Sequence, residues 1–122
     1  MLNFFKNFLS LGFSQDALNH WFWQRITAII MIFLFIWIII SFKNLIINFE
    51  ENFYLWIKVP FNSILFIFLF IIIMHHSTLG ILNIFEDYID ELNKKILLKK
   101  FIKLLSFFLI VVSCISILNI HF

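Results

Sequence analysis

The sequence predicts an all-α membrane protein whose three transmembrane helices form a single domain over residues 1–122. The chain has 122 residues, of which 63% are hydrophobic and 13% are charged, and its mean hydropathy is +1.04. These values lie far from those of water-soluble domains. Three stretches lack Asp, Glu, Lys and Arg, and each is close to the roughly 20 residues with which a helix crosses a bilayer. Since a backbone in lipid must satisfy its own hydrogen bonds, all three are expected to be helical.

The first span is expected over about residues 22–43. Residues 26–42 carry no charge and lie between Arg25 and Lys43. Trp23 and its aromatic neighbours extend this stretch into the headgroup layer, where such side chains are common.

The segment before the first span, MLNFFKNFLSLGFSQDALN, is not expected to be a signal peptide. It lacks an unbroken apolar core and a small-residue cleavage site. Its Phe and Leu residues favour a position along the membrane surface, although Gly12 and Asp16 argue against one.

The second span is expected over about residues 59–86 and the third over about 101–121. Pro60 is the only proline of the chain, and it marks the start of the second helix, because first-turn donors have no intrahelical partner to lose. The third charge-free stretch, residues 104–122, reaches the last residue of the sequence.

The basic residues predict the orientation of the spans. Of the nine Lys and Arg residues, only Lys43 and Lys58 lie between the first and second spans; the others precede the first span or lie between the second and third. Short basic loops stay on the cytoplasmic or matrix side. The N-terminus is therefore predicted to lie inside and the C-terminus outside.

The second span contains ionisable side chains, which are costly in a membrane and usually face a partner, a cofactor or water. His75 and His76 lie within it, and Gly80, Asn83 and Asp87 follow His76 at offsets of 4, 7 and 11. These offsets keep the residues on one helical face.

This face has two interpretations. A helical histidine can hold haem iron, and Gly80 would leave room for the macrocycle one turn from His76. Alternatively, His76 hydrogen-bonds to a neighbouring helix, and Gly80 allows close packing. His75 is the less attractive ligand, because Leu79 crowds its face, and spacing alone leaves the choice between the two imidazoles open.

The sequence EDYIDE ends the same span. The phenol of Tyr88 can reach a quinone carbonyl, and Asp87 can orient it. The simpler interpretation is an interfacial aromatic beside a solvated acidic helix end.

The sequence HWFWQRIT opens the first span. Arg25 is either a positive-inside anchor or a partner for haem propionates and a quinone headgroup, because its fork donates two hydrogen bonds to a carboxylate.

The order HWFWQRITAI, KVPFN, HHSTLGILNIFEDYIDE resembles the small membrane-anchor subunit of succinate dehydrogenase, respiratory complex II, in its alphaproteobacterial and mitochondrial form. The resemblance covers roughly residues 19–91, and the H-x-x-L-G motif followed by EDY is its specific part. It implies the mitochondrial inner membrane, or alternatively a bacterial inner membrane.

The resemblance implies roles for four residues. His76 is similar to one axial ligand of a b-type haem shared with the other anchor subunit, and Gly80, by its spacing from His76, would clear the macrocycle. Tyr88 is similar to the residue that hydrogen-bonds ubiquinone, with Asp87 supporting it. Arg25 looks like the residue near the haem propionates and the quinone pocket.

The resemblance makes the chain a subunit of an enzyme, non-catalytic alone. It has neither a dinucleotide-binding loop nor a cysteine set for clusters, and its one cysteine is Cys114 in the third span. The expected partners are a second anchor subunit, an iron–sulfur subunit, a flavoprotein subunit and the lipid bilayer, with no nucleic acid. The alternatives are a haem-free structural or assembly subunit and, less favoured, a small transporter using His75 and His76 as a proton relay.

Overall fold

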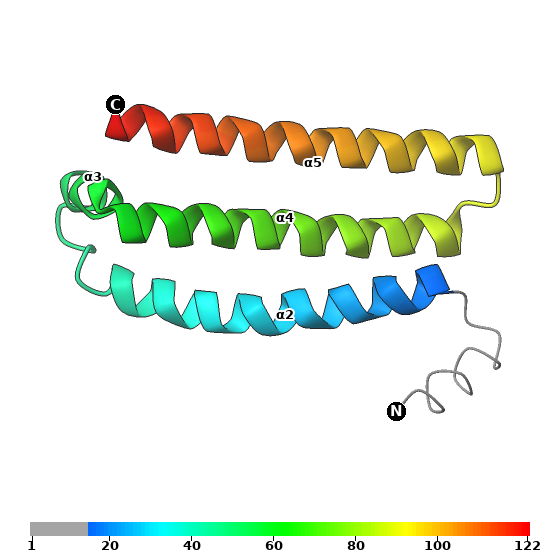
Figure 1. Cartoon of the computed structure of the whole chain (residues 1–122), viewed down its shortest axis with the longest axis horizontal. Coiled ribbons are helices and arrows are strands. Elements are labelled where there is room, and N and C mark those ends of the chain that lie inside the picture. Colours follow the sequence, from blue (N-terminus) through cyan, green and yellow to red (C-terminus); the bar gives the residue numbers. More distant parts are fainter. Residues whose placement is uncertain (1–14) are drawn as a thin grey trace.

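The computed structural model describes residues 15–122, which form four helices and no strand (Figure 1). The helices are α2 (Gln15–Phe42), α3 (Phe49–Lys58), α4 (Pro60–Tyr88) and α5 (Leu92–His121). Three of them have the length and apolar composition to cross a membrane: Leu18–Phe42 within α2, all of α4 and all of α5. The predicted all-α fold with three spans is confirmed. Most of the segment expected at the membrane surface lies outside the described residues.

The first and third predicted spans are the C-terminal parts of longer helices, and the second covers nearly all of α4. Helix α2 begins at Gln15 rather than near residue 22, and α5 begins at Leu92 rather than near residue 101. Charge-free stretches mark the part of a helix that suits hydrocarbon. Lys, Leu and Gln are good helix formers, so the helices continue through the charged turns.

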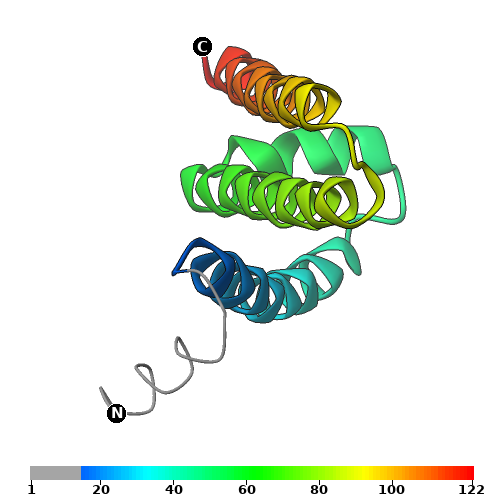
Figure 2. The ribbon, with the colours of Figure 1, turned by 90° about the vertical axis from the view of Figure 1, so that its right-hand side faces the viewer.

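Helix α3 was not predicted, because its charges interrupt the hydropathy of the loop in which it lies. It has an apolar side, on which Ile57 is only 1% exposed, and a charged side with Glu50 and Glu51 in its first turn. The helix crosses the end of the bundle (Figure 2). Val59, the residue between α3 and α4, is extended (φ −69°, ψ 120°), as a following proline favours. The sharp corner between the two helices follows from this Val59-Pro60 pair.

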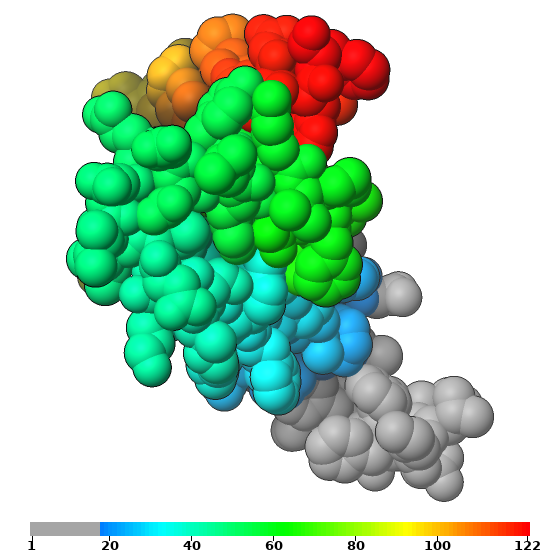
Figure 3. Space-filling view, turned by 90° about the vertical axis from the view of Figure 1, so that its left-hand side faces the viewer, coloured from blue at the N-terminus to red at the C-terminus, as the bar shows by residue number. Residues whose placement is uncertain are grey.

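Aromatic side chains hold α3 against α2 and α4. The Trp56 ring lies 5.6 Å from the Trp37 ring, 5.3 Å from the Phe42 ring and 6.0 Å from the Phe66 ring, measured between centroids. Edge-to-face and tilted pairs at such distances are favourable beyond the area they bury. This cluster fixes the end of the bundle at which α5 also ends. Figure 3 shows that end of the molecule in space-filling form.

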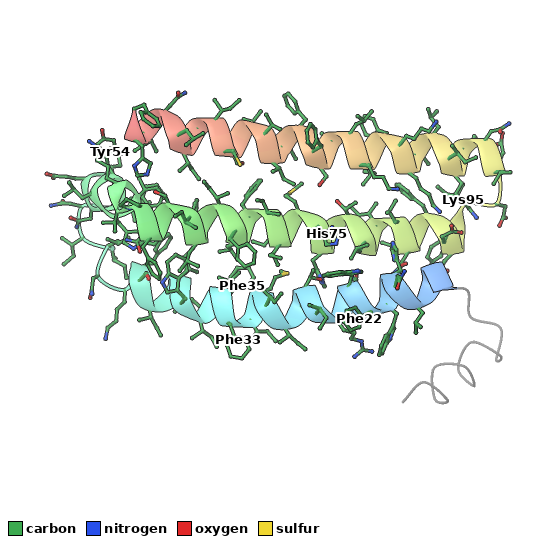
Figure 4. All side chains as sticks on the ribbon, in the orientation of Figure 1. Phe22, Phe33, Phe35, Tyr54, His75 and Lys95 are labelled. Atoms are coloured by element: carbon green, nitrogen blue, oxygen red, sulfur yellow. The ribbon has the colours of Figure 1, made fainter. Side chains whose placement is uncertain are left out.

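The three long helices lie in a row with α4 in the middle (Figures 1 and 2). Helix α4 packs against α2 on one side and α5 on the other. Only 11%, 11% and 6% of the most apolar window of each span is buried within the chain. Large side chains such as Phe33, which is 70% exposed, project from the row (Figure 4). Most of the apolar surface is therefore free to contact lipid or other membrane subunits.

Candidate functional site

His76 lies at the contact between α4 and α2, where its ring meets a threonine hydroxyl. Its Nδ1 atom is 2.9 Å from Oγ1 of Thr27, and Thr27 is only 1% exposed. The same hydroxyl donates to the backbone carbonyl of Trp23 at 2.7 Å. We call this set, His76, Thr27 and the Trp23 carbonyl, the His76 relay. Among residues 18–122, no side chain or backbone group hydrogen-bonds to Nε2 of His76, so that nitrogen is available to a ligand.

His75 lies on a different side of α4, beside the start of α2 (Figure 4). Its ring meets the Trp23 ring edge to face, with the centroids 6.4 Å apart. A shallow cleft of about 420 Å³ runs between the two helices and is lined by Asn19, His20, Trp23, His75 and Leu79. His75 and Leu79 therefore line the same cleft, as their four-residue spacing predicts. His75 is exposed and His76 is half-buried, so the two imidazoles have different surroundings.

Gly80 faces the side chain of Gln24. A Cβ atom added at Gly80 would lie 3.6 Å from Nε2 of Gln24, an ordinary van der Waals distance. Packing of α2 on α4 therefore does not by itself require glycine at this position. Oε1 of Gln24 and Nδ1 of His20 are buried and lack a hydrogen-bond partner among the described residues. Such orphaned polar atoms are costly, and they lie on the same stretch of α2 as Thr27.

Arg25 lies on the side of α2 away from α4. It precedes Thr27 by two residues, which turns it about 200° around the helix. The side chain is exposed, and its guanidinium lies over the Trp21 ring, 5.4 Å from the centroid. Within this chain, Arg25 is therefore not brought to His76 or to Tyr88.

Asp87 and Tyr88 lie in the last turn of α4, and both are exposed. Tyr88 is 81% exposed, and it lies twelve residues beyond His76, or about 18 Å along the helix. Neither side chain makes a hydrogen bond to a described residue. Both are presented to the surroundings of the chain and away from its own core.

An ion-pair cluster joins α4 to α5 beside these two residues. Glu86 accepts from Lys95 at 3.1 Å and from Lys99. Glu86 itself is half exposed. These contacts fix the turn between the two helices and leave Asp87 and Tyr88 unpaired.

Another histidine meets a hydroxyl at the opposite end of the bundle. Nε2 of His121 lies 2.6 Å from Oγ of Ser63, and the Ser63 hydroxyl donates to the carbonyl of Ile57. We call this set the His121 relay. It joins the last turn of α5 to the first turn of α4 and the last turn of α3.

Sequence reasoning missed Thr27, Gln24 and His121. Thr27 and Gln24 belong to the motif QR-x-TA, in which only Arg25 was given a role. A hydroxyl in an otherwise apolar span was the available signal for Thr27. No signal pointed to the pairing of His121 with Ser63, because it depends on the positions of three helix ends. Within residues 18–122, no three His, Cys, Asp or Glu side chains gather as a metal site.

The sequence matches the family model described as succinate dehydrogenase/fumarate reductase transmembrane subunit over residues 5–113. It is 35% identical over 81 residues to the succinate dehydrogenase hydrophobic membrane anchor subunit of Rickettsia prowazekii. The aligned region covers 65% of this chain and 63% of that relative. The subunit of the same name from Rickettsia typhi is 33% identical over 79 residues, 63% of this chain and 62% of the relative. The chain thus spans less than two thirds of the length of these relatives. No solved structure matches it.

Proposed function

The chain belongs to the family of succinate dehydrogenase/fumarate reductase transmembrane subunits, and from that premise we propose that it anchors a succinate dehydrogenase and helps to reduce ubiquinone. The three spans and the scarcity of polar side chains suit an anchor that leaves flavin and iron–sulfur chemistry to other subunits. The observation that carries the finer proposal is the half-buried imidazole of His76, which has one ring nitrogen engaged by Thr27 and the other free.

His76 would supply one axial ligand of a b-type haem, through Nε2. A histidine projecting from a helix in a bundle is an ordinary ligand for haem iron. A haem held there would accept and release single electrons. The described residues fit one ligand at this contact rather than two, since His121 is paired with Ser63, and His20 and His75 line the cleft beside Trp23. The second ligand would therefore come from another anchor subunit.

Gly80 would lie next to the edge of the bound group, one turn from His76. Within the chain, an alanine at this position meets only Gln24 at an ordinary distance, so glycine is explained better by a partner outside the chain. Arg25 points away from α4 and would meet carboxylates or a quinone headgroup on that outer side. Its planar fork suits a carboxylate.

Tyr88 and Asp87 would bind the quinone. An exposed phenol at the end of a membrane-spanning helix can donate a hydrogen bond to a quinone carbonyl, and this bond strengthens as negative charge develops on the oxygen. Asp87 would orient the phenol. The quinone would gain two electrons and two protons here, with the electrons originating from succinate in the subunits bound at this face.

The partners would be a flavoprotein subunit, an iron–sulfur subunit and a second anchor subunit in the lipid bilayer. The lysines in the first turns of α5 would lie on the inner side with Arg25, and the C-terminus would lie outside. The named relatives come from bacteria, which favours a bacterial inner membrane over the mitochondrial inner membrane.

A haem-free structural anchor is the second candidate. It is favoured by the contact of His76 within the chain, because Thr27 partners this imidazole without any cofactor. Under this alternative, the His76 relay would only join α2 to α4.

A reduced-minus-oxidised visible spectrum of the purified complex distinguishes the two candidates. We expect a b-type band that disappears or shifts in His76→Ala and persists in His75→Ala. An unaltered band in His76→Ala would refute the ligand assignment, and the absence of a band in the native complex would favour the haem-free anchor.

A further inference from the structure

Thr27 lies between a backbone carbonyl and an imidazole. Its Oγ1 atom is 2.7 Å from the carbonyl oxygen of Trp23, 3.2 Å from that of Gln24 and 2.9 Å from Nδ1 of His76. A hydroxyl has one hydrogen to donate, and a carbonyl oxygen can only accept.

The direction of both hydrogen bonds follows from these distances. Two oxygen atoms 2.7 Å apart repel each other unless a hydrogen lies between them. The Thr27 hydroxyl therefore donates its hydrogen to the Trp23 carbonyl. It can then only accept from His76, so the hydrogen of the neutral imidazole lies on Nδ1.

We propose that Thr27 is a positioning residue that fixes the tautomer and the orientation of His76, so that the lone pair of Nε2 is presented to haem iron. This inference rests on the proposed function. Metal-binding histidines commonly donate their other ring N–H to an acceptor, which fixes the tautomer. Thr27 is 1% exposed, so water does not compete for the hydrogen bond, and in such surroundings the bond is strong.

The acceptor also sets how strongly the ring donates electrons. A hydrogen bond from Nδ1 raises the basicity of the ligating nitrogen. Because the Thr27 hydroxyl already donates to Trp23, it is a better acceptor than an isolated hydroxyl. Loss of this bond makes Nε2 less basic, which weakens binding of ferric iron more than that of ferrous iron. The midpoint potential of the haem then rises.

The test compares three variants in the intact, haem-containing complex. Thr27→Val keeps the shape of the side chain and removes the acceptor, whereas Thr27→Ser keeps the hydroxyl. Thr78→Val is the matched control, because the Thr78 hydroxyl also donates to a carbonyl four residues earlier, that of Met74 at 2.7 Å, but has no histidine partner. The measurements are the potentiometric midpoint of the b-type band and the low-spin ferric signal in electron paramagnetic resonance.

We expect Thr27→Val to raise the midpoint potential and shift the ferric signal. A tenfold preferential loss of ferric binding corresponds to about 59 mV for a one-electron couple. Thr27→Ser and Thr78→Val should resemble the unmodified complex. If Thr27→Val does not assemble, Thr27→Ala removes the same acceptor and takes its place.

The inference is overturned if a Thr27 variant without a hydroxyl keeps the native potential and ferric signal. It is equally overturned if neither Thr27→Val nor Thr27→Ala assembles while Thr78→Val does, because Thr27 would then serve helix packing alone. Failure of the proposed function is a different result, since it would be seen as a native complex without a b-type band, or with a band that His76→Ala leaves unchanged.

Discussion

The His76 relay and the His121 relay have the same parts, an imidazole, a hydroxyl and a backbone carbonyl, but they meet different needs. Ile57 lies in the last turn of α3, where carbonyls lack intrahelical partners, so the Ser63 hydroxyl satisfies a group that would otherwise be orphaned. Trp23 lies inside α2, and its carbonyl already accepts the helical N–H of Thr27. The backbone therefore needs the hydroxyl of the His121 relay, on Ser63, but does not need the hydroxyl of the His76 relay, on Thr27.

The two relays also engage opposite ring nitrogens. In the His121 relay, the engaged atom is Nε2, which leaves only Nδ1, the nitrogen bonded to Cγ and the more hindered of the two. In the His76 relay, the engaged atom is Nδ1, which leaves the projecting Nε2. Of the two free nitrogens, the projecting Nε2 of His76 is the one that a group outside the chain can reach more easily, which is why the proposed ligand is His76 and not His121.

The largest effect is expected for Tyr88, which lies at the end of α4 beyond the His76 relay, and it tests whether function is confined to that side of the molecule. Tyr88→Phe should lower succinate-dependent quinone reduction roughly 10²-fold, the size typical of losing a donor to a developing negative charge. Succinate oxidation by a soluble dye should be unaffected. Tyr54, the other tyrosine of the chain, lies on α3, the helix that carries Ile57 of the His121 relay, and Tyr54→Phe is the matched control. Equal losses with quinone and dye would contradict a quinone role.

Gly80 tests whether the space beside His76 belongs to a group outside the chain. Gly80→Ala adds a Cβ atom that α2 accommodates at 3.6 Å from Gln24, so the complex should assemble normally. A bound macrocycle would be crowded by roughly 1–3 kcal/mol, and haem affinity should fall on the order of tenfold. Haem content per complex measures this. Native haem content in an assembled Gly80→Ala complex would show that the glycine is not needed for clearance.

The sequence predicts the parts of this site that depend on one helix. The three spans follow from charge-free stretches, and His76, Gly80 and Tyr88 are related by spacing along α4 alone. The start of α4 at Pro60 follows from the chemistry of that residue and is present in the structure.

The contacts between helices could not be predicted in this way. Thr27 and His76 are 49 residues apart, and their pairing depends on how α2 is rotated against α4. Helix α3 escaped prediction because its acidic residues lower the local hydropathy, while its stability comes from aromatic contacts with α2 and α4. The roles of Arg25 and Tyr88 stay predictions, because both side chains face surfaces that other subunits would cover.

His121→Ala offers a way to break the comparison. If the His121 relay is structural, this variant should keep the b-type band and lose about 1 kcal/mol of stability, within the range for hydrogen bonds between membrane helices. Thermal unfolding of the complex in detergent, followed together with the visible spectrum, measures both quantities. A shifted band in His121→Ala would mean that this relay also affects the haem, and the distinction between the two relays would fail.

The smallest effect concerns the other connection between α4 and α5. The His121 relay joins these helices through the hydroxyl of Ser63, a residue that is only 4% exposed. Glu86, whose side chain is 52% exposed, joins them through Lys95 and Lys99. Exposed ion pairs contribute about 0–1 kcal/mol and weaken with salt. Glu86→Gln should therefore lower the unfolding temperature less than His121→Ala does. At high salt, the unfolding temperatures of the Glu86→Gln complex and the native complex should be equal. Glu91→Gln is the matched control, because Glu91 pairs only with Lys94 of its own turn, at 3.6 Å. A larger loss in Glu86→Gln than in His121→Ala would mean that the charged turn, and not the buried relay, holds α5 against α4.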